Sequence, residues 1–364
     1  MRWSPQQDSA LVAVRSWLQA GDRPVFRLFG YAGTGKTTLA RHVAEGVGGN
    51  VVYAAFTGKA AHVMRGKGCH EAGTIHSLIY RMRGEDETGP SFVLNRESAA
   101  AKAAMIVIDE CSMVDEEIGK DLLSFGKPVL VLGDPAQLPP VSGGGFFTEG
   151  EPDVMLTEVH RQAADDPIIR LSMTVREGGT VAYGQYGESS VLSRRDIAPD
   201  AVLSADTVLV GRNNTRRAYN GRIRELLGRP VPTPVAGDTL VCLKNDRKRG
   251  LLNGSLWHVD RVRPQRKGLL RYGLSPDEGD HGKGRTVVTI NPAYFDGTAE
   301  SLTPSERKRS DAFDFGYVLT VHKSQGSQWD DVVLFDESFA FRENAWRWLY
   351  TGITRAAKRI RIVR

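Results

Sequence analysis

The sequence lacks the features that mark secreted, zinc-binding and membrane proteins. Among its 364 residues there are only three cysteines, Cys69, Cys111 and Cys242, which are widely spaced and form no CxxC pair. Such spacing favours neither a disulfide framework nor a zinc site. No apolar run approaches the roughly 18 residues that a membrane-spanning helix needs, and the N-terminus, MRWSPQQDSA, has no apolar signal-peptide stretch. We therefore expect a cytoplasmic protein with no membrane partner.

The bulk composition is ordinary for a globular protein. Hydrophobic residues make up 41% of the chain and charged residues 25%, and the length leaves room for about two or three domains. The formal net charge of +5 is compatible with a polyanionic partner, although many basic proteins bind no nucleic acid.

A nucleotide-binding loop is predicted in PVFRLFGYAGTGKTTLARHVAEGVG. A short buried strand is predicted from the apolar residues Val25, Phe26, Leu28 and Phe29, and a helical pattern begins at Lys36. Between them the pattern GxxxxGK[ST] runs from Gly30 to Thr37, and this setting disfavours a chance glycine-rich turn. Its backbone N–H groups and Lys36 would hold the phosphates of ATP, and Thr37 would join a Mg²⁺ shell. The candidate nucleotide-binding residues are Gly30, Gly33, Thr34, Gly35, Lys36, Thr37 and Thr38.

Two further loops follow apolar strands. The run Ala104–Ile108 ends at Asp109 and Glu110; we expect Asp109 to hold Mg²⁺ and Glu110 to polarise the attacking water. The alternative is that this acidic pair only caps the next helix. The second strand, Val129–Leu132, leads into GDPAQLPPV, whose prolines would fix a loop that presents Gln137 to the γ-phosphate.

Polar residues also interrupt the C-terminal stretch YVLTVHKSQGSQWDDVVLF. Two apolar runs flank His322, Lys323, Ser324 and Gln325, where a buried strand would ordinarily end in a plain turn. Taken alone, this segment is more simply explained as a solvated loop. It gains meaning from the motifs that precede it in the chain.

Six motifs in order resemble those of superfamily 1 helicases. They are GYAGTGKTT, VIDECSM, GDPAQLPPV, LTEVHRQ, TVHKSQGSQWDDV and YTGITRA. The chain is most similar to the 5′-to-3′ branch, which includes the RecD-like and phage Dda-like helicases, and the likeness spans nearly the whole length.

The resemblance implies an α/β fold of two RecA-like P-loop NTPase domains with parallel sheets and two insertions. The first RecA-like domain would comprise residues 1–80 and 103–165, and the second 166–236 and 311–364. Residues 81–102 would form a small pin that splits the duplex, although a disordered loop explains their polar character nearly as well. Residues 237–310 alternate apolar and polar positions and would form an SH3-like β-barrel.

The resemblance also implies roles for individual residues. Gln7 would read adenine, while Arg161 and Arg355 would be arginine fingers; Gln325 and Gly326 would relay the state of the nucleotide, and Tyr350 would pack near it. The implied DNA contacts in the RecA-like domains are Thr57, Lys59, Thr74, His76, Asn213, Asn214, Thr320, His322 and Lys323. Two alternatives stay open: His76 could be a core histidine, and Arg216 and Arg217 could belong to a solvated helix face.

The insertions supply further candidate DNA contacts. Phe92 would be the wedge of the pin and stack on a base at the fork. Lys244 and Trp257 would line a single-strand channel. Other basic residues and one more aromatic residue would share that wall: Arg247, Lys248, Arg249, Arg261, Arg263, Arg266, Lys267 and Tyr272.

The implied function is an ATP-dependent DNA helicase that translocates 5′-to-3′ on single-stranded DNA and unwinds forks. Replication, recombination or repair proteins are the expected protein partners. Two alternatives remain: a RecD-like ATPase subunit that needs a recombination or repair partner, and a helicase that acts on RNA. Because no nuclease motif is recognisable, strand cutting is not expected to be intrinsic.

Overall fold

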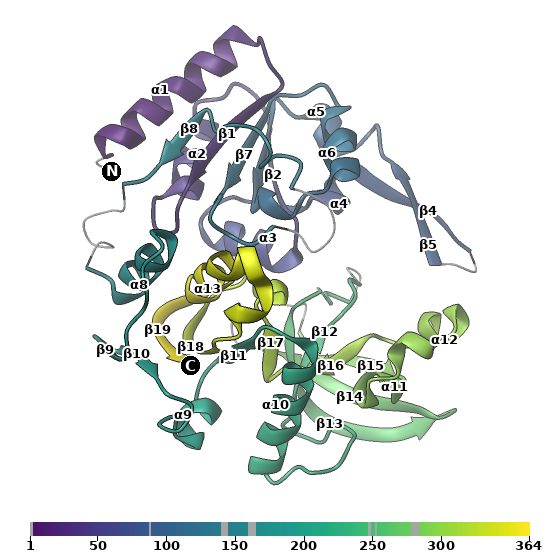
Figure 1. Cartoon of the computed structure of the whole chain (residues 1–364). Helices are drawn as coiled ribbons and strands as arrows, with labels where there is room; N and C mark the ends of the chain where they lie inside the picture. The colour runs from purple at the N-terminus through teal and green to yellow at the C-terminus, as the bar shows by residue number, and fades with distance from the viewer. Residues whose placement is uncertain are drawn as a thin grey trace.

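The computed structural model describes residues 3–86, 89–139, 145–158, 165–246, 249–251, 253–277 and 284–364, without the side chains of residues 82–91. Its strands form two six-stranded sheets, a five-stranded sheet and a two-stranded hairpin (Figure 1). Along these described ranges, no helix combines the length and the apolar character needed to cross a membrane.

The first α/β domain is built on an entirely parallel sheet with the strand order β3-β2-β6-β7-β1-β8. Its strands are β1 (Val25–Gly30), β2 (Val51–Ala55), β3 (Gly73–Thr74), β6 (Met105–Asp109), β7 (Val129–Gly133) and β8 (Val154–Leu156). Its helices are α1 (Pro5–Ala20), α2 (Lys36–Glu45), α3 (Gly58–Gly66), α4 (Ile75–Ile79), α5 (Ala99–Lys102), η1 (Cys111–Met113) and α6 (Glu116–Leu123).

Both faces of this sheet are covered, because separate apolar clusters fill the two sides. One cluster joins the sheet to α1, α2 and α3, and the other joins it to α4, α5 and α6. The central strand β6 is apolar from Met105 to Ile108 and completely buried there, as expected for a strand with helices on both faces. The predicted strands at Val25–Phe29, Ala104–Ile108 and Val129–Leu132 are confirmed, each with shifts of a residue or less at its ends.

The second α/β domain has the strand order β17-β11-β18-β19-β10-β9, parallel except for the β9–β10 pair. Its strands are β9 (Gly184–Tyr186), β10 (Ser189–Leu192), β11 (Thr207–Val210), β17 (Val318–Thr320), β18 (Trp329–Phe335) and β19 (Ala356–Val363). Its helices are α8 (Pro167–Arg176), α9 (Pro199–Leu203), α10 (Asn213–Leu226), η3 (His322–Ser324), η4 (Ser338–Asn344) and α13 (Ala345–Ile353).

An antiparallel sheet with the order β15-β14-β13-β12-β16 is inserted into the second domain. Its strands are β12 (Thr239–Cys242), β13 (Leu256–Arg266), β14 (Leu269–Pro276), β15 (Thr286–Ile290) and β16 (Phe313–Phe315), and α11 (Ala293–Asp296), η2 (Ala299–Ser301) and α12 (Pro304–Lys308) lie between β15 and β16. β16 thus completes this sheet just beyond the expected boundary at residue 310.

The core of the five-stranded sheet corrects one expectation from the sequence. Trp257 and Tyr272, predicted to line a DNA channel, are each only 1% exposed and pack with Leu240, Val288 and Phe313. The Trp257 indole N–H donates to the Ser255 hydroxyl (2.8 Å). The alternation of apolar and polar residues in β13 and β14 turns these aromatic rings inward, so they serve as core residues.

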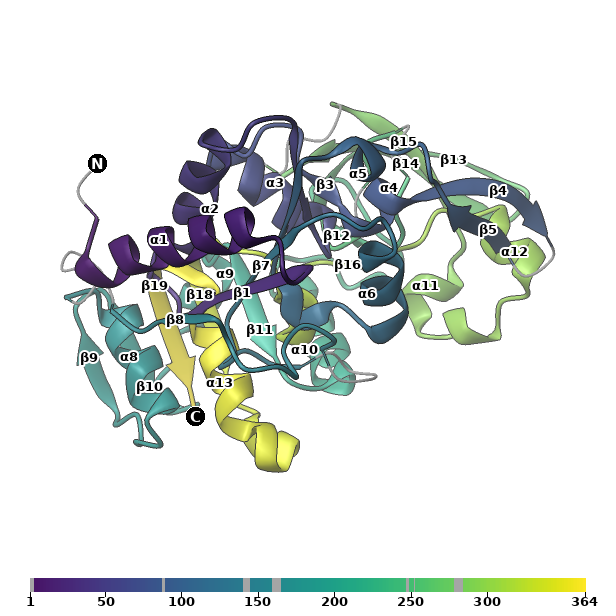
Figure 2. The ribbon, with the colours of Figure 1, turned by 90° about the horizontal axis from the view of Figure 1, so that it is seen from above.

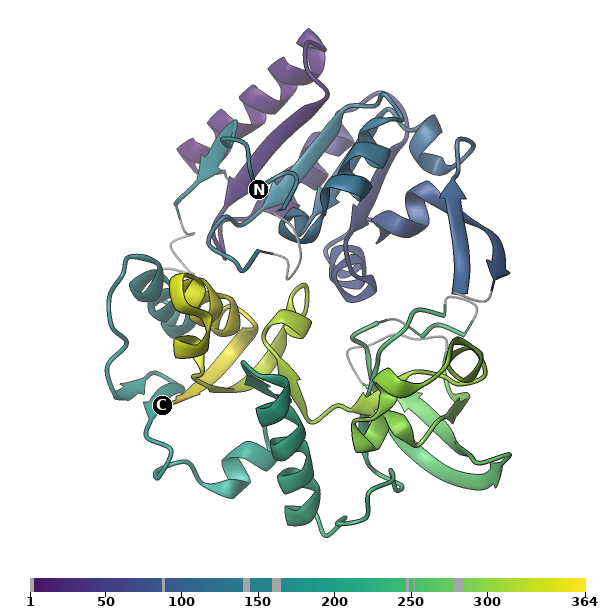
Figure 3. The ribbon, with the colours of Figure 1, turned by 45° about the vertical axis from the view of Figure 1, so that its right-hand side comes forward.

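The hairpin β4 (Tyr80–Asp86) and β5 (Gly89–Leu94) projects from the first domain. Figures 1 and 3 place it on the same side of the molecule as the five-stranded sheet. The first α/β domain thus carries the hairpin, and the second carries the five-stranded sheet. The segment between the hairpin and β6 returns to the first domain, where Ala100 and Ala103 are buried in the core.

Candidate nucleotide-binding site and DNA-contact residues

The P-loop folds tightly at the carboxyl end of β1. Gly30 accommodates this turn, since a Cβ atom there would lie 2.6 Å from the Thr34 hydroxyl and 2.8 Å from Leu156 Cβ. The Lys36 ammonium donates to the carbonyl oxygens of Gly30 (2.6 Å) and Tyr31 (2.9 Å). The loop therefore holds its cation above the N-terminus of α2, where phosphate oxygens are favoured.

The acidic pair lies beside this loop, at the carboxyl end of β6. The Thr37 hydroxyl donates to Asp109 Oδ2 (2.9 Å), so the two expected Mg²⁺ ligands are already adjacent. Glu110 has a left-handed backbone conformation with φ 53°, which is uncommon for a residue other than glycine. Burial raises the pKa of the Glu110 carboxyl, and the opposing Arg355 charge offsets part of this effect.

Gln137 lies between the two α/β domains. The side chains of its neighbours Ala136 and Leu138 belong to the apolar core of the second domain. Gln137 itself lines the pocket, and its buried Oε1 has no hydrogen-bond partner among the described residues. An unpaired buried amide oxygen is costly, so this atom is placed to bind a water molecule or a ligand.

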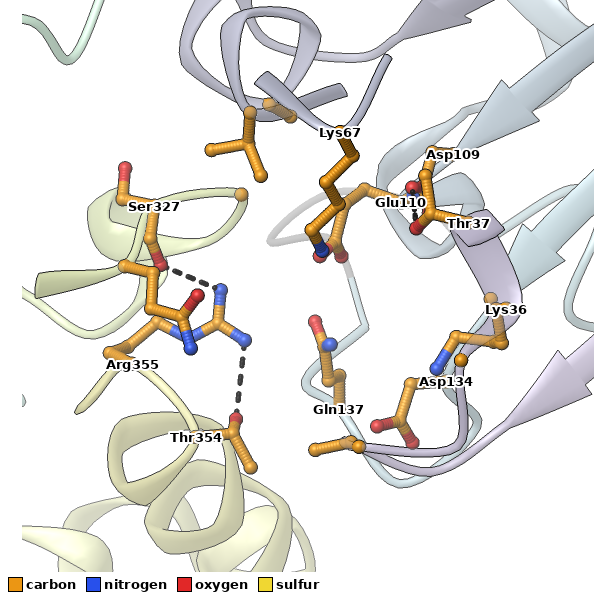
Figure 4. A pocket seen from close by; sticks show the side chains of 18 of the residues that line it. Lys36, Thr37, Lys67, Asp109, Glu110, Asp134, Gln137, Ser327, Thr354 and Arg355 are labelled. Carbon is orange, nitrogen blue, oxygen red and sulfur yellow. Dashed lines mark hydrogen bonds between the residues drawn. The ribbon is translucent and has the colours of Figure 1, made fainter. Parts of the chain in front are cut away.

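The second domain closes the pocket with Arg355, which follows α13. This buried guanidinium donates to the carbonyl oxygens of Thr351 (3.1 Å) and Ser327 (3.2 Å) and to the Thr354 hydroxyl (3.2 Å). Figure 4 shows it facing Glu110 and Gln137 across the pocket. These fixed contacts hold the cation toward the phosphate-binding side.

Residues from both domains enclose a pocket of about 310 Å³. Ten of the residues predicted from sequence line it: Gly33, Gly35, Lys36, Thr37, Thr38, Asp109, Glu110, Gln137, Gly326 and Arg355. Sequence reasoning gave no role to Asp134 or Lys67, which also line the pocket. Lys67 follows α3 and belongs to no recognised motif, so no signal in the sequence pointed to it.

Tyr350 connects the second domain to the P-loop. Its hydroxyl donates to Asp134 Oδ2 (2.6 Å) and accepts from the Ala32 N–H (3.2 Å). Burial and the Asp134 carboxylate raise the pKa of Tyr350 well above its usual range, so the phenol stays protonated. The expected packing of Tyr350 near the nucleotide site is thus realised as a specific polar contact.

A second connection joins the domains at Leu138. Its carbonyl accepts from Gln325 Nε2 (2.9 Å), and its N–H donates to the Thr351 hydroxyl (2.9 Å). Gly326 approaches α3 so closely that a Cβ atom would lie 2.8 Å from Ala60 Cβ and 2.9 Å from the Thr57 hydroxyl. The segment after η3 therefore packs directly on the first domain.

Gln6 and Gln7, at the start of α1, bond to neighbouring parts of the first domain. Gln7 is buried, and its Nε2 donates to the Thr34 carbonyl (3.1 Å), while its Oε1 accepts from the Ser4 N–H in a capping box. Gln6 instead bonds β8 through the Met155 carbonyl (3.1 Å). Gln7 does not line the pocket described above, so its adenine-reading role stays a prediction.

Predicted DNA contacts in the first domain occupy helix starts and the base of the hairpin. The hydroxyls of Thr57 and Thr74 accept from the N–H groups of Ala60 (3.1 Å) and Ser77 (3.2 Å). Lys59 lies 4.1 Å from the centre of the Trp329 ring, which makes it a contact between the domains.

His76 is exposed, so the alternative of a core histidine does not hold. Its ring lies 4.7 Å from that of Tyr80 and 4.5 Å from that of Phe92, which is itself 44% exposed. These three rings form a partly exposed aromatic cluster where the hairpin leaves the domain.

The predicted DNA contacts after β17 differ in exposure. Thr320 is buried, and its hydroxyl accepts from the Lys323 N–H (3.4 Å). His322 is half-buried against Phe341 (5.4 Å between ring centres), and burial lowers its pKa. The side chain of Lys323 is exposed.

At the start of α10, Asn213 and Asn214 are exposed, as is Lys244 after β12. Arg217 is exposed, as expected of a solvated face, but Arg216 is buried and pairs with Asp314 (2.7 Å). Arg249 pairs with Asp246 (2.8 Å) and Asp311, so its charge is neutralised within the chain. Arg161, Arg247 and Lys248 lie outside the described residues.

Glu337, after β18, holds the start of α10 in place and was missed from sequence. Its carboxylate, 1% exposed, accepts from the Gly211 N–H (2.8 Å), from the Arg212 backbone and guanidinium, and from the Thr215 hydroxyl (2.7 Å). Burial alone would raise the pKa of Glu337, but these donors outweigh it and hold the pKa below its usual value.

Two α/β domains with a P-loop, a paired carboxylate site and an opposing arginine define a P-loop nucleotide-binding protein. The family model for the AAA domain matches residues 3–196, and that for the UvrD-like helicase C-terminal domain matches residues 315–363. Because the AAA-domain model covers more than half of the chain, the chain belongs to that family. Its match to the helicase C-terminal domain and its ordered motifs make the chain similar to RecD-like superfamily 1 helicases.

Curated relatives and solved structures agree with this assignment. The chain is 29% identical to the ATP-dependent RecD2 DNA helicase of Deinococcus radiodurans over 93% of its own length and 47% of the relative's. It is 34% identical to the ATP-dependent DNA helicase dda of Enterobacteria phage T4 over 41% and 37%, respectively. The chain thus spans about half the length, or less, of these relatives.

The fold resembles that of Pif1 helicases. A structure of Pif1 helicases at forked double-stranded DNA matches with a TM-score of 0.61 at 18% identity, covering 99% of this chain and 92% of that one. Pif1 from Candida albicans matches with a TM-score of 0.58 at 19% identity, covering 100% and 95%.

Proposed function

We propose that the protein is an ATP-dependent DNA helicase that moves 5′-to-3′ along single-stranded DNA and unwinds forked duplex in the cytoplasm. The observation that carries this proposal is the pocket between the α/β domains. Lys36, Thr37 and Asp109 enter it from one side and Arg355 enters from the other. A nucleotide bound there would link the positions of the two domains to its own chemical state.

In this proposal, the chain supplies charge and positioning for phosphoryl transfer to water. Lys36 and Arg355 stabilise the charge of the γ-phosphoryl group as its bond to the ADP oxygen breaks. Glu110, with its raised pKa, accepts the proton of the attacking water. Gln137 orients that water through its unpaired Oε1.

The site also has the donor chemistry for Mg²⁺. The Thr37 hydroxyl and the Asp109 carboxylate are in contact at 2.9 Å, and hard oxygen ligands of this kind suit the ion. When bound, Mg²⁺ would neutralise developing charge on the phosphates.

We also propose roles for the two insertions that the sequence predicted. The β4–β5 hairpin, with the exposed ring of Phe92, serves as the duplex-splitting pin, and the five-stranded sheet serves as an SH3-like domain. Single-stranded DNA passes over both α/β domains, in contact with Thr57, His76 and Phe92 on one side and with Asn213, His322 and Lys323 on the other. The closely packed Gln325 and Gly326 transmit nucleotide-dependent movement to that path.

A partner-dependent ATPase subunit is the second candidate. The chain is 27% identical to the RecBCD enzyme subunit RecD of Mycobacterium tuberculosis over 92% of its length, a relative that is named as part of an assembly. A subunit of this kind would hydrolyse ATP on DNA but unwind little by itself, and replication, recombination or repair proteins would be its partners.

The test is ATP hydrolysis measured without nucleic acid, with single-stranded DNA and with single-stranded RNA, followed by unwinding of forks that carry only a 5′ or only a 3′ tail. Stimulation by DNA with unwinding from the 5′ tail alone supports the proposal. Stimulation without unwinding favours the subunit, and stronger stimulation by RNA favours an RNA helicase.

A Glu110→Gln variant tests the hydrolysis step. It should retain ATP binding and lose turnover by about 10²- to 10⁴-fold, because it removes only the proton acceptor. Turnover close to that of the wild type would remove Glu110 from the catalytic role.

A further inference from the structure

One hairpin of the inserted five-stranded sheet carries a dense run of positive charge. The segment RVRPQRKGLLR, residues 261–271, contains five basic residues and no acidic residue. The formal net charge of the whole chain is +5, so the remaining residues balance 43 basic against 43 acidic side chains. A hairpin with five basic residues and no acidic residue is a candidate surface for an anionic partner.

Three of these charges share one face of the five-stranded sheet. Arg261 pairs with Gly273, and Arg263 pairs with Arg271 across the antiparallel strands β13 and β14. Paired residues lie on the same face, and the neighbouring positions Leu270, Tyr272 and Leu274 are buried on the other face. We call this outward surface, made by Arg261, Arg263 and Arg271, the arginine face.

Among the described residues, no acidic side chain pairs with the arginine face. Like charges directly opposite each other destabilise an antiparallel pair, yet Arg263 and Arg271 occupy such positions. No ion pair involves the three arginines among the described residues. The nearest acid in the sequence, Asp260, accepts from the Ser275 hydroxyl (2.7 Å) and pairs with Arg285 (3.4 Å).

The side chains of this face suit phosphates and not stacked bases. Single-strand binding surfaces interleave basic side chains with aromatic platforms, but Trp257 and Tyr272 are in the core. The cross-strand partners of the face on β15 are Val287 and Thr289, which are small and offer no ring. Planar guanidinium groups bind phosphate oxygens regardless of sequence.

The location of the face also separates it from the nucleotide site. Figures 1 and 2 both place β13 and β14 far from α13 and the P-loop strand β1, on the side of the molecule that carries the β4–β5 hairpin. A surface in that position lies on the same side of the molecule as the element proposed to part the strands.

We propose that the arginine face binds the phosphate backbone of the duplex part of a forked DNA, outside the single-strand path; this inference rests on the proposed helicase function. Such a contact would hold the unopened duplex next to the hairpin while the α/β domains move along the single strand.

The test compares a triple variant, Arg261→Gln with Arg263→Gln and Arg271→Gln, with a control that removes the same charge elsewhere. The control is Arg15→Gln with Arg194→Gln and Arg195→Gln, three exposed arginines far from this sheet in the sequence. Dissociation constants are measured across a salt series for a 5′-tailed fork, for a single strand equal to the tail, and for blunt duplex.

For the arginine-face variant, we expect fork and blunt-duplex affinity to fall about tenfold at low salt, with unchanged single-strand affinity. The slope of log K against log salt should lose about 0.9 for each phosphate contact removed. The control should match the wild type. Because the variant relieves charge repulsion, its thermal unfolding midpoint should not fall below that of the wild type.

Equal losses for the fork and the single strand would overturn the proposal by placing the face in the single-strand path. Unchanged affinity for all three DNAs would overturn it in favour of a different anionic partner. Failure of the proposed function would look different, because the wild type would then show no ATPase stimulation by single-stranded DNA.

Discussion

The two six-stranded sheets share a largely parallel arrangement but differ in what their loops carry. The first sheet presents Lys36, Asp109 and Glu110 at the carboxyl ends of its strands, as is typical of ligand sites in open α/β sheets. In the second sheet, the loops and helix ends carry Gln325 and Arg355, whose functional contacts reach the first domain or the shared pocket.

In the proposed function, this difference divides the tasks between the two α/β domains. The first can hold a phosphate chain with its own backbone and side chains, while the second supplies a cation and several polar contacts to the first. Tyr350 bonds the P-loop and Asp134, and Gln325 bonds Leu138. Movement of the second domain would therefore change the geometry of the nucleotide site directly.

Arg355→Ala should have the largest effect, because it removes the contribution of the second half to the reaction. We expect a loss of about 10³- to 10⁵-fold in ATP turnover, with ATP affinity close to that of the wild type. Turnover is measured by phosphate release and affinity by fluorescent-nucleotide titration. Arg355→Lys keeps the charge without the planar fork and should remain strongly impaired; turnover within tenfold of the wild type in the alanine variant would break the proposed division of tasks.

Lys36→Ala should affect the first half in a different way. Turnover should fall by about 10³-fold, and ATP affinity should fall with it, because Lys36 belongs to the phosphate cradle itself. DNA binding should stay measurable in a gel-shift assay, since the variant leaves the proposed DNA path untouched. Loss of DNA binding in a folded Lys36→Ala protein would contradict the separation of the two sites.

Glu337→Gln tests how the Glu337 carboxylate of the second domain holds the loop before α10. We expect a decrease of about 3 kcal/mol in the free energy of unfolding at pH 7, because a buried carboxylate with several donors is lost. The pKa of Glu337 is depressed in the folded protein, so its contribution is complete above the unfolded pKa of about 4.3 and declines as the pH falls through the folded pKa.

The difference in stability between the wild type and this variant should therefore narrow below about pH 4.3, as followed by urea unfolding. Glu343→Gln, at an exposed position of η4, is the control and should change little. A stability difference that stays constant into acid would mean that Glu337 carries no charge in the folded protein.

Tyr350→Phe should have the smallest effect. It removes one hydroxyl that lies between Asp134 and the Ala32 N–H, and a buried hydrogen bond to a charged group contributes about 1.5 to 3 kcal/mol. We expect ATP turnover to fall about tenfold, mainly in the DNA-stimulated rate. Tyr183→Phe, at an exposed tyrosine, should leave the rate unchanged; an equal loss in both variants would argue against a specific link.

The loops of the nucleotide site were predictable because their chemistry depends on local spacing. Gly30 to Thr37, Asp109 and Gln137 each follow an apolar strand, and parallel strands bring such ends to one edge. The contacts of Tyr350 and Glu337 were not predictable in this way. Their partners lie far away in the chain, at Asp134 and Gly211, and no local pattern encodes that distance.

Burial of large polar or aromatic side chains was also hard to predict. Trp257 and Arg216 were expected at DNA-facing or solvated positions, yet the first fills a sheet core and the second pairs with Asp314. The face of a strand that a residue occupies depends on register, which the neighbouring strands set, and the buried face of a helix depends on what packs against it. Composition alone could not separate these residues from Arg263, which is exposed.

Because Gly326 has no side chain, the segment after η3 can pack closely on α3 of the first domain. Its backbone has φ +73°, and a Cβ atom would lie 2.8 Å from Ala60 Cβ, nearer than carbon atoms pack. A methyl group there would push the segment after η3 away from α3, at the border of the pocket that Gly326 lines. The contact between the two α/β domains at this point therefore depends on the absence of a side chain.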